Sequence, residues 1–164
     1  MRYALRQKLV SLGTNYTITG EDGSEFEIKG DPMRIFDRFS FQDKDGNEVA
    51  EIALAIERWR GVYEIHRDGR LIAEVRRDIY AFFPRHRFTI ETGGANELVA
   101  IGDFLDLEYR IKRGEREIAR FTKQWFHLSD TWGIDITKGE QDPVFVLAVA
   151  VIIARARQRL WSRG

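Results

Sequence analysis

The fold is decided by one stretch late in the sequence, Asp142-Pro143-Val144-Phe145-Val146-Leu147-Ala148-Val149-Ala150-Val151-Ile152-Ile153-Ala154. Asp142 is a good N-cap and Pro143 a good first helical residue, and the residues that follow up to 154 contain no polar side chain. Their β-branched members would also suit a strand. The cap, the alanines and the Arg-rich continuation after residue 154 favour a helix over about residues 143–160.

A helix that is apolar on every side must be buried on every side. At about 1.5 Å per residue the apolar part is only ~16 Å long. A helix that spans a bilayer needs roughly 20 apolar residues, so this one fits a protein core better. We therefore expect the rest of the chain to enclose it.

The residues before the helix have the pattern of short β-strands. Apolar and polar residues alternate at 16–18, 26–28, 63–65, 88–90 and 109–111, which is typical of strands with one buried face. Turn signals rich in Gly and Asp separate them, at 21–23, 43–47, 67–69, 92–94 and 112–114. We count about 12 candidate strands between residues 1 and 137. The simplest architecture is an all-β, 12-stranded closed antiparallel barrel around the helix.

The residues expected to point into this barrel follow from the alternation. They are Ile18, Phe26, Ile28, Ile52, Tyr63, Ile65, Val75, Phe88, Ile90, Tyr109, Ile111, Ile134 and Ile136. A weak repeat supports the same fold, because turn glycines 46, 69 and 114 are each followed a few residues later by an alanine, at 50, 73 and 119. A small inner residue would leave room for a bulky centre; chance likeness among hairpins is the alternative.

Length and composition limit the class of protein. The 164 residues form one expected domain, 1–164, and 43% hydrophobic residues are enough for a core. Lys+Arg and Asp+Glu are both 26, and this neutrality argues against a nucleic-acid binder. Cysteine is absent, which excludes disulfides, thiolate metal sites and cysteine nucleophiles. No long apolar stretch opens the chain, so we expect a cytoplasmic protein, peripheral to the membrane if it binds lipid.

An ordered series of short motifs resembles one known family. It runs RQKLVSLG at 6–13, YTI at 16–18, EDG at 21–23, FQDKDGNE at 41–48, YEIHRDG at 63–69, AEV at 73–75, GDF at 102–104, EY at 108–109, WF at 125–126 and DTWGI at 130–134. The series resembles the LURF-one-related (LOR) family of the tubby-like superfamily, and most of all its small bacterial single-domain members.

The resemblance implies a 12-stranded closed barrel wrapped around a hydrophobic C-terminal helix. It supplies no catalytic motif. Tubby proteins bind phosphoinositides through basic surface residues, and the related phospholipid scramblases act at membranes. The tubby basic pattern is not recognisable here, so lipid binding is an expectation by analogy at the level of the superfamily.

Metal and catalytic chemistry have little support in the residues. His66, His86 and His127 lie on different expected hairpins, without metal-ligand spacing. The segment 43–47, DKDGN, resembles half a calcium loop, but its glycine is at the fourth position and Leu54 stands where the bidentate Glu is needed. An acidic turn explains it better. We expect no bound metal and no cofactor.

The carboxylates of Asp103, Asp106 and Glu108 form the densest acidic set in the second half of the chain. Alternation puts Asp106 and Glu108 on the outer face, where carboxylates are solvated, and Asp103 follows Gly102 at a bend. No nucleophile elbow, phosphate loop or dinucleotide fingerprint is present. We therefore predict no catalytic centre.

The hairpin around residues 76–87 is the candidate binding site. Two basic clusters, Arg76 with Arg77 and Arg85 with Arg87, flank an aromatic connection that contains Tyr80, Phe82 and Phe83. Aromatic and basic side chains together suit the surface of an anionic membrane. In the alternative reading the aromatics pack inward and the arginines pair with Glu74, Asp78 or Glu91.

The C-terminal cations Arg155, Arg157, Arg159 and Arg163 are interpreted as complementing the helix dipole rather than as a binding tail. The functional hypothesis is thus a non-enzymatic domain that binds anionic phospholipid head groups or a membrane surface. The alternative is a protein-interaction or scaffold module without a small ligand, and an enzyme is a distant third.

Overall fold

The computed structural model describes residues 1–10, 13–31, 37–54, 61–78, 87–94, 97–102, 108–123, 131–140 and 142–161. These form twelve strands and one helix: β1 (Arg2–Val10), β2 (Gly13–Gly20), β3 (Glu25–Gly30), β4 (Arg38–Asp43), β5 (Glu48–Leu54), β6 (Val62–Arg67), β7 (Arg70–Arg77), β8 (Arg87–Glu91), β9 (Leu98–Gly102), β10 (Glu108–Arg113), β11 (Arg116–Thr122), β12 (Thr131–Ile136) and α1 (Pro143–Trp161). The predicted helix, 143–160, is confirmed to within one residue.

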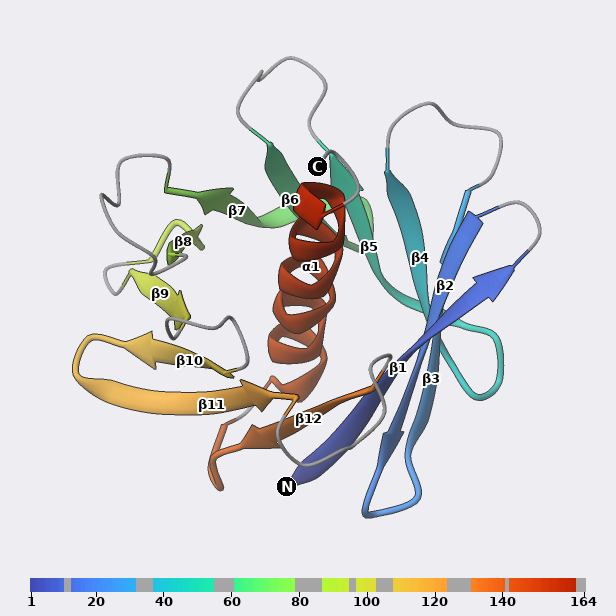
Figure 1. Ribbon diagram of the computed structural model, residues 1–164, viewed down its shortest axis with the longest axis horizontal. Helices are drawn as coiled ribbons and strands as arrows, with labels where there is room; N and C mark the ends of the chain where they lie inside the picture. The colour runs from blue at the N-terminus through green and yellow to red at the C-terminus, as the bar shows by residue number, and fades with distance from the viewer. Residues whose placement is uncertain are drawn as a thin grey trace.

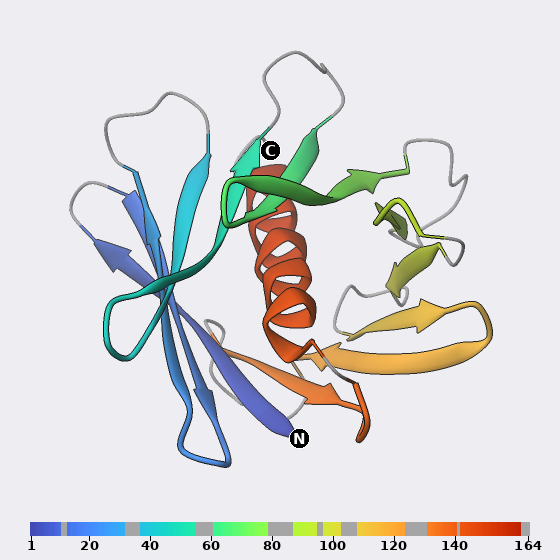
Figure 2. The same ribbon diagram turned by 180° about the vertical axis from the view of Figure 1, so that it is seen from behind.

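The strands form one closed antiparallel barrel, as predicted. Each strand pairs with its neighbours in sequence, and β1 pairs with β12 to close the ring. Figure 1 shows the strands arranged around α1, and Figure 2 shows the same helix crossing the interior from the opposite side. Every backbone edge is therefore paired within the ring, and the inner face is filled by the helix.

The barrel has two different ends, an exit end and a turn end. At the exit end the odd-numbered strands finish, and Arg155 near the end of α1 bonds to Asp37 beside β4. At the turn end the even-numbered strands finish, and Arg67 at the end of β6 bonds to Asp142 in front of α1. The helix thus enters the barrel at the turn end and reaches the exit end.

Burial of α1 follows the prediction from its sequence. Every residue from Val146 to Ala154 is buried, and Leu147 at the middle of the run has no exposed surface. Twelve of the thirteen residues expected to point inward are buried as well. The exception is Phe26, which is only partly buried: it lies next to the β2–β3 turn and packs on Phe41 with the ring centroids 5.3 Å apart.

The alanine repeat is confirmed and has a structural basis. Ala50, Ala73 and Ala119 are buried and pair across the ladder with large apolar residues, Phe41, Ile65 and Ile111. The register shifts immediately beyond each of these pairs. Three hairpins thus share a small residue on the inner face followed by a β-bulge, which increases the local twist of the strands.

The start of α1 is fixed by Asp142. Its Oδ1 accepts a hydrogen bond from the Phe145 amide at 3.2 Å, and its two carboxylate oxygens accept from Arg67 at 2.9 and 3.0 Å. Burial alone would raise the pKa of Asp142, but the bonds from Arg67 and Phe145 outweigh it and lower the pKa below its usual value. The cap therefore ties the helix to the β6–β7 hairpin.

The described part of the chain contains no helix that combines the length and the hydropathy needed to cross a membrane.

Candidate functional site

A buried ion pair anchors α1 at the exit end. Arg155 donates from Nε and Nη2 to the two carboxylate oxygens of Asp37, both at 2.9 Å. The side chains are 20% and 8% exposed, and the hydroxyl of Tyr63 donates a further bond to Asp37 at 3.1 Å. Burial by itself would lower the pKa of Arg155, but the paired carboxylate more than offsets this and raises it. Arg155 therefore has a structural role.

Tyr16 and Gln158 continue this polar layer across the barrel. Gln158 Oε1 accepts a bond from Arg155 at 3.0 Å and one from the Tyr16 hydroxyl at 3.4 Å. Burial raises the pKa of Tyr16 to about 12, against the opposing effect of the Arg155 charge. The phenol is protonated and acts as a donor to Gln158.

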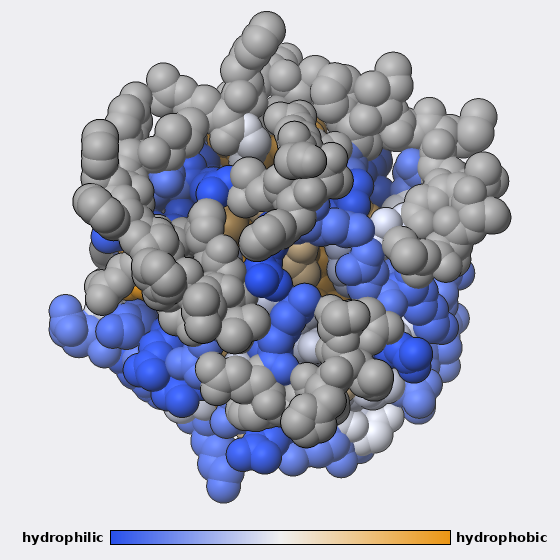
Figure 3. All heavy atoms as spheres, viewed as in Figure 1, coloured by the Kyte–Doolittle hydropathy of each residue, from blue (hydrophilic) through white to orange (hydrophobic). Residues whose placement is uncertain are grey.

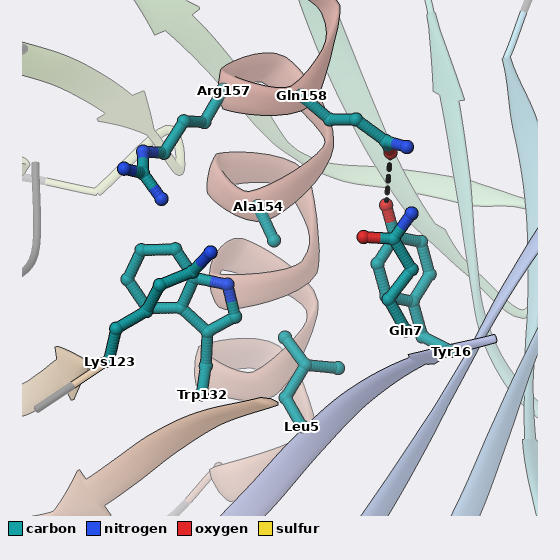
Figure 4. Close-up of a pocket in the computed structure, with 8 residues that line it drawn as sticks. All are labelled: Leu5, Gln7, Tyr16, Lys123, Trp132, Ala154, Arg157 and Gln158. Atoms are coloured by element: carbon teal, nitrogen blue, oxygen red, sulfur yellow. Dashed lines mark hydrogen bonds between the residues drawn. The ribbon is translucent and has the colours of Figure 1, made fainter. Parts of the chain in front are cut away.

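A cavity of about 340 Å³ lies beside this layer. Its lining residues come from four strands or their ends and from the last turns of α1, and Figure 4 draws them: Leu5, Gln7, Tyr16, Lys123, Trp132, Ala154, Arg157 and Gln158. Arg157, Lys123 and Trp132 form one side, whereas Gln7, Tyr16 and Gln158 form the other. The volume is at the small end of the range of ligand-binding pockets.

The cationic side of the cavity is built on an aromatic stack. Phe121 stacks on Trp132 with ring centroids 4.2 Å apart and planes at 13°. Lys123 Nζ lies 4.9 Å and the Arg157 guanidinium carbon 5.1 Å from the Trp132 ring centroid. Because Phe121 covers one face of the indole, the opposite face is left to the two cations. Cation–π contacts of this kind hold charged groups in place.

Arg157 differs sharply from Arg155, two residues before it. Arg155 makes the bidentate bond to Asp37, whereas within the described residues no carboxylate pairs with Arg157. The Nε–H of Arg157 is buried and makes no hydrogen bond in this part of the structure. A buried donor without a partner costs about 1–3 kcal/mol, so a small movement of Arg157 that brings this N–H to an acceptor would be favourable.

The sequence-predicted hairpin site lies at the same end of the barrel. Arg76 on β7 pairs with Glu91, and Arg87 on β8 pairs with Asp78 at 3.1 Å. Val75 and Phe88 point inward, as expected, and Arg77 pairs with Phe88 across the ladder. The two arginines Arg76 and Arg87 therefore form the ion pairs of the alternative interpretation. The remaining predicted residues, Tyr80, Phe82, Phe83 and Arg85, lie outside the described residues.

The other candidates from the sequence form no site in the described residues. His66 lies 3.3 Å from Glu64, and His86 and His127 fall outside the description. Asp43 accepts bonds from the amides of residues 45 and 47, as an acidic turn requires. The described residues contain no group of three potential metal ligands.

Glu108 corrects one prediction. It is not simply solvated on the outer face: its side chain is 18% exposed and accepts a bond from Arg110 at 3.0 Å, with Arg120 3.9 Å away. Arg110 lies two residues further along β10 on the same face, whereas Arg120 comes from the neighbouring strand β11, which alternation within one strand does not reveal. Asp103 and Asp106 lie outside the described residues.

Sequence reasoning missed the cavity although the signal was present. Gln7 continues the inner-face series of Tyr3 and Leu5, and Lys123 follows two residues after the buried Phe121. A polar residue that falls on the inward phase of a strand is informative, because the inner face is otherwise apolar.

A search of the curated proteins found no match. Among solved structures, the chain is similar to an X-ray structure of a protein from Arabidopsis thaliana, with a TM-score of 0.66 and 15% identity over 95% of this chain and 91% of that one. At this identity the likeness shows the fold alone. A family model described as LURP-one-related, the correct form of the LOR family's name, matches residues 1–154. The chain therefore belongs to the LURP-one-related family.

Proposed function

We propose that this protein is a non-enzymatic binding domain whose exit end binds anionic phospholipid head groups at a membrane surface. Membership of the LOR family and the closed tubby-like barrel support a binding domain rather than an enzyme. Among the described residues no three potential metal ligands come together.

The observation that carries the proposal is the uneven charge of the two ends. The turns at the turn end are mainly acidic, with Glu21, Asp22, Asp45, Asp68, Glu97, Glu115, Glu140 and Asp142 against Lys44 and Lys138. Of the arginines beside these turns, Arg67 and Arg113 pair with acids of the same end, Asp142 and Glu140. Arg70 and Arg116 are exposed at this end and offset part of its negative charge. The exit end carries the cations Arg76, Arg77, Arg87, Lys123, Arg155 and Arg157 against the acids Asp31, Asp37, Asp78 and Glu108. Two of these acids, Asp37 and Asp78, pair with Arg155 and Arg87. A neutral protein with this polarity is steered with one end toward an anionic surface.

The aromatic residues of the connecting segments are also unevenly distributed along the sequence. By sequence, the connections 32–36, 55–60, 79–86, 103–107 and 124–130, which each follow an odd-numbered strand, contain at least one aromatic residue, whereas the connection 11–12 contains none. The turns at the other end contain no aromatic residue. In Figure 3 the described residues are mostly hydrophilic, and hydrophobic ones are visible near the centre of the face. Aromatic and basic residues together favour the membrane interface.

Flotation with neutral and anionic vesicles tests the proposal. We expect binding to anionic vesicles only, weakening as salt rises because exposed charges are screened within ~8 Å at physiological ionic strength. In the double variant Arg76→Gln, Arg87→Gln the partition coefficient should fall about tenfold or more, since each arginine near an anionic surface contributes roughly 1 kcal/mol. Glutamine is chosen because glutamate would face Glu91 and Asp78.

The matched control is Arg70→Gln, Arg116→Gln, which removes the same charge from exposed residues at the turn end. It should bind anionic vesicles as the unmodified protein does. Equal losses in both variants would mean that overall charge, and not the exit end, governs binding. No preference for anionic vesicles at low salt would refute the membrane proposal and favour the protein-interaction alternative.

A further inference from the structure

We propose that the cavity at the exit end is a specific site for the phosphate group of a phosphate monoester, with Arg157 and Lys123 as its ligands. This site is distinct from the arginines of the β7–β8 hairpin and does not depend on membrane binding. The shared chemistry is a phosphate monoester, whether it belongs to a soluble metabolite or to a lipid head group.

The first step of the argument is the state of Arg157. Its guanidinium lines the cavity and rests 5.1 Å from the Trp132 ring centroid, but its Nε–H is buried without a hydrogen-bond partner in the described residues. An arginine that only closed the barrel would be expected to pair as Arg155 does with Asp37. A guanidinium with donors left over, in the wall of a cavity, suits an oxyanion with several acceptor oxygens.

The second step is the charge of the wall. Lys123 continues the inner face of β11 beyond Phe121 and brings a second cation to the same Trp132 ring, at 4.9 Å. A phosphate monoester carries a charge of about −1.5 to −2 at pH 7, which matches two cations, whereas a carboxylate matches one. The charge of the wall therefore favours phosphate over carboxylate.

The third step is the rest of the lining. Opposite the cations stand the neutral Gln7 and the protonated phenol of Tyr16, whose pKa burial raises to about 12. Leu5 and Ala154 add apolar surface between the two sides. A cavity of about 340 Å³ has room for a phosphate with a small hydroxylated group attached. Polar neutral groups on that side can bind hydroxyls, and they bring no negative charge.

The probes are glycerol 3-phosphate, inorganic phosphate, glycerol and acetate, studied by calorimetry and by NMR of the arginine Nε–H and tryptophan indole resonances. We expect saturable binding of glycerol 3-phosphate with shifts at Arg157 and Trp132, and no binding of glycerol. Arg157→Gln should weaken binding at least tenfold, because a hydrogen bond between charged groups is lost. Arg157→Lys should recover part of it.

Two controls keep the result interpretable. Arg116→Gln and Lys138→Gln remove exposed cations at the turn end and should leave binding unchanged. Lys123→Gln provides a second test on a different element if Arg157→Gln fails to fold, and it too should weaken binding. The proposal is overturned if glycerol 3-phosphate does not bind, if acetate binds equally well, or if folded Arg157→Gln and Lys123→Gln proteins bind normally.

Vesicles distinguish this site from the proposed function. Binding to anionic vesicles without any shift of Arg157 by soluble phosphate esters would refute the phosphate site and leave the membrane proposal standing. Binding of glycerol 3-phosphate without vesicle binding would refute the membrane proposal and support a soluble ligand. Competition between glycerol 3-phosphate and vesicles that contain phosphatidic acid would support the site and identify the lipid head group as the source.

Discussion

Truncating Leu147 tests whether the helix is the core of this protein. Leu147 lies in the middle of α1, has no exposed surface and is surrounded by the inward residues of the barrel. The substitution Leu147→Ala removes buried apolar atoms from the core and leaves a cavity in their place. The wall cannot easily move in to fill that cavity, because its twelve strands are hydrogen-bonded into a closed ring.

Core Leu→Ala changes cost about 2–5 kcal/mol, and the cost rises where the surroundings cannot collapse. For Leu147 we therefore expect a loss of about 3–5 kcal/mol in the free energy of unfolding, out of a total of about 5–15 for a typical domain. Urea unfolding followed by circular dichroism measures it, with the midpoint shifted and the slope little changed.

Leu71→Ala is the matched control, since it removes the same atoms from a β7 side chain that is 49% exposed. Its cost should be within about 0.5 kcal/mol of zero. A loss at Leu147 below about 1 kcal/mol, or one equal to that at Leu71, would refute the view that α1 is packed on all sides.

Two further predictions concern the helix cap and the sheet. The pKa of Asp142 is lowered in the folded protein, so its charge contributes stability above the ordinary pKa of about 3.9, and this is lost as the pH falls through the folded value. Asp142→Asn keeps a capping side chain, so acid titration of stability should show a smaller loss than in the unmodified protein; an identical acid profile would contradict the role of the Arg67 pair. At Gly102 an added Cβ would lie 2.7 Å from the Tyr109 ring, so Gly102→Ala should lower the melting temperature and cost about 1–3 kcal/mol. At Gly94 the nearest atom is Thr92 Oγ1 at 3.5 Å, so Gly94→Ala should be tolerated, and equal costs at the two glycines would show that the clash is not the cause.

The fold could be predicted from the sequence because its determinants are local. Asp142 and Pro143 identify the start of the helix, and the apolar run after them requires burial on all sides. Alternation at 16–18, 26–28, 63–65, 88–90 and 109–111 identifies five of the strands, and Gly-containing turns identify the hairpins beside them. Each of these signals is complete within a few residues, and each agrees with the structure.

The candidate site could not be predicted in the same way because it is assembled over long distances. Arg155 and Asp37 are 118 residues apart in the chain, and Tyr16 and Gln158 are 142 apart. Whether Arg157 faces Trp132 depends on the rotation of α1 inside the ring and on the β1–β12 register that closes it. Sequence periodicity gives the phase of each element but not the alignment between elements.

The position of α1 inside the barrel has a consequence for the order of folding. Most strand pairs join neighbours in the chain, so hairpins can form as the chain is synthesised. The inner faces of these hairpins, with Leu5, Ile18 and Ile65 among their buried residues, are completed only by a helix that follows all twelve strands. A growing chain therefore exposes a wide apolar surface until residues 143–161 arrive, and such surfaces are prone to aggregate. The nascent chain therefore needs protection from aggregation until the helix that completes its core has been synthesised.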